Sequence, residues 1–143
     1  MKKRNEPKFT YEDSYTKCEV IDNKYGRTFV GEAKCNPVDK DFESLITGST
    51  IAEMRARIHA LTAYRNDLKI KLEALNQLLY SMNHSKKFNR ESYEAKMLFR
   101  QIRFTKEDVE MINGYIKDMK KDLKDYIDGK EKVYQILRRK DNK

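Results

Sequence analysis

The sequence predicts an α+β protein: a small N-terminal antiparallel β-hairpin or sheet, then a long, coiled-coil-like antiparallel two-helix hairpin that forms oligomers. Two short β-like segments flank a turn, and two long segments after them repeat apolar residues at alternating intervals of three and four. Charged and apolar residues each make up 38% of the 143-residue chain. So few apolar residues cannot fill a thick core, whereas a long helix needs only an apolar stripe. We expect one domain, residues 1–143.

The N-terminal region is expected to contain an arm and a β region. Residues 1–13 are charged and contain Pro7, which predicts a flexible or edge-like arm. In residues 14–36, the segments SYTKCEVID and RTFVGEAKC flank NKYG, where Asn23 and Gly26 can adopt positive φ. This pattern predicts a hairpin. Because an isolated hairpin is only marginally stable, it must pair with more strand or pack on a helix.

Residues 49–82 are predicted to form the first helix. Thr50 and Glu53 have the spacing of a capping box, in which hydroxyl and carboxylate each satisfy a backbone N–H. One arginine, Arg65, interrupts the heptad seam, and a cation there should pair with a carboxylate or face a polar cavity. The seam comprises Ile51, Met54, Ile58, Leu61, Arg65, Leu68, Leu72, Leu75, Leu79 and Met82.

Residues 90–138 are predicted to form the second helix, with Asn83, Asn89 or Ser92 able to cap near the loop. A glycine inside a helix costs about 1 kcal/mol relative to alanine. Gly114 therefore predicts a close helix approach or a bend, and Gly129 predicts a helix end. The second seam comprises Leu98, Ile102, Thr105, Val109, Ile112, Ile116, Met119, Leu123 and Tyr126, and continues weakly through Val133 and Leu137.

Apolar residues outside the two seams favour self-association. They widen the apolar stripe beyond what one partner helix can cover, and large exposed apolar surfaces are uncommon on soluble monomers. The sequence therefore predicts a homodimer or a larger bundle. These residues are Tyr64, Ile70, Leu78, Phe99 and Phe104.

The residue pattern predicts no enzyme activity, no cofactor and no metal site. It contains no nucleophile elbow, no glycine-rich phosphate loop and no HExxH motif. Cys18, Cys35, His59 and His84 lack the paired spacing of a zinc site. The chain has no apolar run of about 20 residues and no secretory signal, so we expect a cytoplasmic protein with reduced thiols and no membrane partner.

The net charge of +8 favours anionic partners. Guanidinium groups bind phosphates bidentately, and aromatic rings stack on bases. Arginines and aromatic residues near the hairpin turn and the two helix starts are therefore candidates for a nucleotide site. The alternative is that the arginines form surface ion pairs with neighbours such as Glu53 and Glu107. The candidate ligand-binding residues are Arg27, Arg55, Arg57, Phe99, Arg103, Phe104 and Asn113.

The segment RTFVGEAKCNPVDKDFESLITGSTIAEMRARI resembles a known family. It contains a strand with the pattern GxAxCxPxD, then a glycine, then IAxxRAxI before a two-helix hairpin. This order of motifs resembles the first family of phage anti-Thoeris proteins, the Tad sponges. The resemblance covers about residues 25–60 in motif and the rest in architecture. Within the shared segment, the resemblance implies a ligand-binding role for Arg27 and Arg57.

This resemblance implies a non-enzymatic sponge that acts in the cytoplasm of the infected bacterial host. Such proteins sequester the cyclic ADP-ribose signals of Thoeris immunity, and some bind the cyclic oligonucleotide signals of CBASS immunity. The family forms dimers that can associate into hexamers. On this interpretation, Gly26, Gly31 and Ala33 let the strand approach a helix or the ligand closely.

Two alternatives remain open at the level of sequence. A basic coiled-coil protein of a phage could bind nucleic acid, although acidic residues alternate with basic ones along the second helix and weaken this case. A structural or adaptor coiled coil would bind other helices and no small molecule.

Overall fold

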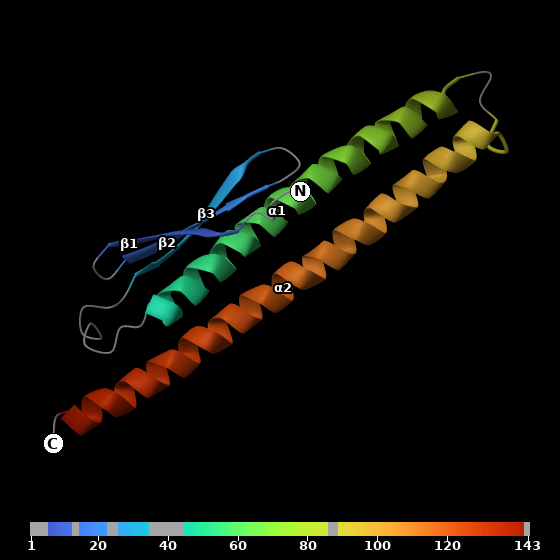
Figure 1. The fold of residues 1–143 in the computed structure, drawn as a ribbon. Helices are drawn as coiled ribbons and strands as arrows, with labels where there is room; N and C mark the ends of the chain where they lie inside the picture. Colours follow the sequence, from blue (N-terminus) through green and yellow to red (C-terminus); the bar gives the residue numbers. More distant parts are fainter. Residues whose placement is uncertain (1–5, 13–14, 23–25, 35–44, 86–88, 142–143) are drawn as a thin grey trace. The chain divides into compact units, whose positions relative to one another are not determined.

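The computed structural model confirms the α+β class (Figure 1). A three-stranded antiparallel sheet, in the order β1-β2-β3, precedes two long helices. The elements are β1 (Lys8–Glu12), β2 (Tyr15–Ile21), β3 (Thr28–Lys34), α1 (Leu45–Asn83) and α2 (Tyr93–Asp141). The structure describes residues 6–12, 15–22, 26–34, 45–85 and 89–141. Residues 35–44, which include Cys35 and precede α1, lie outside this set.

The predicted hairpin is present as β2 and β3. Gly26 has φ of 68°, and its N–H donates to the carbonyl oxygen of Asp22 at 2.8 Å. The N–H of Asp22 donates to the carbonyl oxygen of Arg27 at 2.7 Å, which closes the turn. A positive φ is cheap only without a Cβ, so Gly26 is used for the turn. The expected close approach of Gly26 to a helix is not found, because a Cβ there would meet no described atom within 4 Å.

The third strand, β1, was not expected as regular structure. Residues 8–12, placed by the sequence in a flexible or edge-like arm, pair antiparallel with β2, and Phe9 lies opposite Cys18. Phe9 packs against the buried core, and its ring stacks on that of Tyr11, with centroids 6.2 Å apart. The arm is therefore an edge strand over these residues. Residues 1–5 and 13 lie outside the described set.

The chain divides into two compact units. The first comprises residues 1–61 and 117–143, and the second comprises residues 62–116. In the first, the start of α1 lies against one face of the sheet (Figure 1). The core of this unit is built from small side chains: Cys18, Ala33, Ala52 and Ala56, with Phe9, Val20 and Ile51 packed against them.

In the second unit the helices form an antiparallel pair, and the seam prediction for this part of α2 is confirmed. Its buried residues are Ala95, Leu98, Ile102, Thr105, Val109, Ile112 and Ile116. The corresponding seam residues of α1 are half-buried: Arg65, Leu68, Leu72, Leu75, Leu79 and Met82. Thr105, the one hydroxyl in the α2 seam here, donates to the carbonyl oxygen of Gln101 at 2.7 Å and so loses no hydrogen bond on burial.

Both helix starts differ from the prediction. α1 begins at Leu45, and Thr50 already lies inside it, donating through Oγ1 to the carbonyl oxygen of Ile46 at 2.7 Å. The capping box at Thr50 and Glu53 is therefore wrong. α2 begins at Tyr93, where the hydroxyl of Ser92 accepts a hydrogen bond from the N–H of Ala95 at 3.2 Å. Ser92 is thus the N-cap of α2 among the three residues considered.

Two of the roles predicted for the glycines of α2, a close approach at Gly114 and a helix end at Gly129, are not found in the described residues. A Cβ at Gly114 would meet no atom within 4 Å, so there is no close approach there. α2 continues through Gly129 to Asp141, so that glycine does not end the helix.

Neither described helix contains an apolar stretch of the length that a membrane span requires.

Candidate ligand-binding site

The resembling segment contains the contact between β3 and α1. Arg55 donates through Nη1 to the carbonyl oxygen of Glu32 at 2.6 Å, and Nδ1 of His59 lies 2.7 Å from the carbonyl oxygen of Val30. Pairing alternates along the hairpin, and the turn bonds Asp22 to Arg27, so the carbonyls of Val30 and Glu32 point away from β2. α1 therefore covers acceptors on the outer edge of the sheet.

The spacing of these contacts follows from helix and strand geometry. Four helical residues rise about 6 Å, and two strand residues rise about 6.7 Å. Arg55 and His59, four apart on α1, can therefore reach carbonyls two apart on β3. The sequence made Arg55 a candidate ligand-binding residue. In the structure, Arg55 and His59 both contact carbonyl oxygens on the edge of β3.

Gly31 sets the distance between β3 and α1. A Cβ at this position would lie 2.0 Å from the carbonyl oxygen of Ala52 and 2.3 Å from the backbone N of Ala56. Only glycine fits, because backbone atoms of a helix cannot move aside. The expected close approach of Gly31 is thus confirmed, with the helix as the neighbour, and Ala33 is buried in the same core.

Arg57 lies on the opposite side of α1 from Arg55, because two residues along a helix turn by about 200°. Its Nη2 donates to Oε1 of Glu53 at 2.8 Å, and its side chain is 49% exposed. Burial raises the pKa of the Cys18 thiol, the Glu53 carboxylate raises it further, and Arg57 lowers it. The Glu53–Arg57 pair thus lies at the exposed margin of the small-residue core.

Arg27 stays at the hairpin turn. Its Nη2 is 3.0 Å from Oδ2 of Asp22, and its guanidinium lies over the ring of Phe29 at 5.5 Å. The pair fixes Arg27 beside the turn that Gly26 makes. Each of the three candidate arginines in this unit therefore has a partner of its own, and Arg55 and Arg57 point to different sides of the helix.

The four candidates of the second unit also have local partners. Phe99 is half-buried, with the guanidinium of Arg90 5.5 Å from its ring centroid. Arg103 lies over the exposed ring of Phe104 at 5.2 Å. The side-chain oxygen of Asn113 accepts a hydrogen bond from Nη1 of Arg65 at 3.1 Å. Arg65 thus pairs with an amide, where the sequence predicted a carboxylate or a polar cavity.

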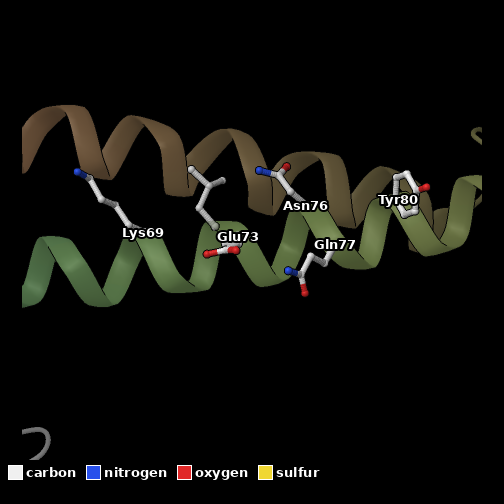
Figure 2. A pocket seen from close by; sticks show the side chains of 6 residues that line it. Lys69, Glu73, Asn76, Gln77 and Tyr80 are labelled. Atoms are coloured by element: carbon white, nitrogen blue, oxygen red, sulfur yellow. The ribbon is translucent and has the colours of Figure 1, made fainter.

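A groove of about 450 Å³ lies along α1 in the second unit (Figure 2). Its lining residues follow one flank of the helix: Lys69, Leu72, Glu73, Asn76, Gln77 and Tyr80. The amides can hydrogen-bond, Lys69 supplies a cation, and the exposed ring of Tyr80 lies 4.2 Å from the ring of His84. Because one helix supplies every lining residue, the groove can enclose a ligand only when another surface covers it.

None of the seven predicted site residues lines this groove. The sequence interpretation missed Asn76, Gln77 and Tyr80, which flank the leucine seam at the spacing of one helix face. It also missed Arg90, which precedes α2. A helical projection of residues 69–80 would have placed the polar residues and the tyrosine on one face, but it would not have shown that they line a groove. In the described residues, no cluster of three histidine, cysteine or acidic side chains is placed to hold a metal.

Comparison of the chain with known proteins found no similar protein. No protein-family model matches the chain. No significant match is found among curated proteins. The solved structures likewise contain no significant match.

Proposed function

We propose that this protein is a non-catalytic sponge that binds a phosphate-bearing cyclic nucleotide signal and holds it unchanged. Cyclic ADP-ribose isomers are the first ligand class, and cyclic oligonucleotides are the second. The protein acts as a homo-oligomer in the cytoplasm of a bacterium infected by a phage. The observation that carries this proposal is that the described parts of the resembling segment, β3 and the start of α1, pack together, with Gly31 against the backbone of Ala52 and Ala56.

Arg57 is the best phosphate ligand of the candidates. Its guanidinium is half-exposed and is held by Glu53 in a surface pair at i, i+4 spacing. Such pairs contribute only about 0.3–0.5 kcal/mol, so an anion can displace the carboxylate at little cost. A phosphate also accepts two parallel hydrogen bonds from one guanidinium. Arg55 is a poorer ligand, because leaving Glu32 would uncover the edge of β3.

Oligomer formation supports this function for a physical reason. Small-molecule sites usually bury 70–90% of the ligand surface. The groove on α1 is lined by one helix, and the candidate arginines face different local partners. A second copy can supply the missing walls, as the exposed aromatic residues of both helices favour.

Capture and release test the proposal. The purified protein is mixed with cyclic ADP-ribose or with a cyclic dinucleotide, freed of unbound ligand by gel filtration, denatured by heat, and the released material is identified by mass spectrometry. We expect an intact ligand. Empty protein with both probes would overturn the proposal, and a ligand recovered with altered mass would overturn its non-catalytic part.

Matched arginine variants locate the site. Arg57→Ala should abolish capture while leaving the circular dichroism spectrum unchanged. Arg139→Ala removes the same charge from an exposed position on α2 and should capture ligand normally. Equal capture by the two variants would count against Arg57. A protein that ignores both probes but binds duplex DNA, with affinity falling steeply as salt rises, would instead be a nucleic-acid-binding protein.

A further inference from the structure

α2 carries a second apolar surface besides its seam. Five residues, called here the outer stripe, form it: Tyr93, Met97, Phe104, Met111 and Tyr115. Four of them are 45–74% exposed and Met97 is half-buried. At about 100° per residue, all five lie within about 20° of the direction of Phe104, and the seam lies about a third of a turn away. Within the second unit, the described residues leave this stripe uncovered.

The outer stripe has symmetric spacing about Phe104. Met97 and Met111 lie seven residues before and after it, and Tyr93 and Tyr115 lie eleven residues before and after it. Each apolar residue before Phe104 is therefore matched by one of the same type after it. With a two-fold axis beside Phe104, each residue of the stripe in one copy therefore lies level with a residue of its own type in the other copy, so the two stripes match along their whole length.

Charges beside the stripe are complementary in the antiparallel orientation. Arg100 and Glu107 lie four residues before and three residues after Phe104, about 40° and 60° to the same side of its direction, and both are exposed. Neither has an ion-pair partner within the described part of the chain. Antiparallel pairing about Phe104 brings Arg100 of one copy beside Glu107 of the other, which parallel pairing does not.

From these observations we propose that the outer stripe binds the same stripe of a second copy, antiparallel, with the two-fold axis beside Phe104. Tyr93 then lies level with Tyr115, Met97 with Met111, and Phe104 with itself. Tyrosine, phenylalanine, methionine and arginine are the residues enriched at protein interfaces. Arg103, over the ring of Phe104, holds that ring at the centre. The matched spacing of the stripe and the charges beside it fit a second copy of the same chain.

This surface specifies the self-association that the proposed function uses, but its evidence and its tests involve no ligand. A sample that forms the predicted dimer and ignores cyclic nucleotides would retain this inference and overturn the function. A sample that captures ligand without this interface would do the reverse.

A charge exchange tests the direction of pairing. By sedimentation velocity over a concentration series, the full chain should form a dimer. Arg100→Asp and Glu107→Arg should each raise the dissociation constant at least tenfold, because each places like charges side by side across the interface. Combining them should restore the dimer. Lys106→Asp makes the same change on another side of α2 and should not weaken it. A monomeric wild type, or weakening by the two variants with no recovery in the double, would overturn the inference.

A disulfide tests the register. In a Cys35→Ser background the remaining native thiol, Cys18, is fully buried. Phe104→Cys should form a covalent dimer on mild oxidation, because the axis places residue 104 beside its own copy. Glu110→Cys, about a third of a turn away on the exposed surface, should remain uncrosslinked. Equal crosslinking of both variants, or crosslinking of Glu110→Cys alone, would contradict the register.

Discussion

Nη1 of Arg55 lies 2.6 Å from the carbonyl oxygen of Glu32, so a side chain of α1 occupies an acceptor on the outer edge of the sheet. His59, one turn later, does the same for Val30. Unpaired strand edges can recruit other chains, and proteins protect them with covering elements and charges. The small sheet is therefore stable and closed on this side because α1 lies along it.

Arg55 and Arg57 should differ in their contribution to stability. Arg55→Ala should lower the free energy of unfolding by about 1 kcal/mol, because it removes a charge-assisted bond to a backbone carbonyl. Arg57→Ala should lower it by less than about 0.5 kcal/mol, because it removes only a surface ion pair. Urea denaturation followed by circular dichroism measures both. A larger loss with Arg57→Ala would contradict the edge role of Arg55.

Gly31→Ala should be among the most damaging single-methyl substitutions in the chain. The added Cβ would overlap the backbone of Ala52 and Ala56, and overpacking costs about 1–3 kcal/mol or more. We expect a loss near the upper end and a matching fall in melting temperature. Gly114→Ala, where a Cβ meets no atom within 4 Å, should instead stabilise α2 by about 1 kcal/mol. Equal effects of the two substitutions would rule out this packing.

Arg65 should be replaceable with a gain in stability. Its Nε is buried and has no hydrogen-bond partner in the described part of the chain, although Nη1 reaches Asn113. Arg65→Leu should raise the free energy of unfolding by about 1 kcal/mol, because it removes this unsatisfied group and restores an apolar seam residue. Arg65→Ala, which leaves space at the seam, should not. A loss of stability in chemical denaturation of Arg65→Leu would show that the Arg65–Asn113 contact outweighs the buried Nε.

Cys18 should make stability fall at alkaline pH. Burial raises the pKa of its thiol, and Glu53 adds to the effect. The unfolded chain loses this proton above the ordinary thiol pKa of about 8.5, while the folded chain keeps it. The contribution of the protonated Cys18 thiol to the free energy of unfolding is thus complete below that pH, and it is lost as the pH rises toward the folded-state pKa. Denaturation between about pH 8 and pH 9.5 should show a steeper decline for the native protein than for Cys18→Ala. Parallel pH profiles would contradict this role.

Much of the helical architecture could be predicted from the residues themselves. The seam from Leu98 to Ile116 repeats at the helical period, and the structure buries it as expected. Gly26 in NKYG likewise predicted the turn, because few other residues adopt positive φ without strain. β1 was missed because its five residues acquire a strand only by pairing with β2. Strand formation depends more on the pairing and packing partners of a segment than on its own residues.

The candidate site could be predicted less well from the sequence, because it too depends on contacts between separate segments. Arginine type and spacing suggested phosphate binding for Arg55 and Arg57 alike, but only the fold places Arg55 on Glu32 and Arg57 on Glu53. The sequence by itself determined periodicity, turn chemistry, charge and the mirror spacing about Phe104, because these depend on residue order alone. The tertiary structure decided which side chains have partners and which remain exposed, because distant segments meet only after α1 packs on the sheet.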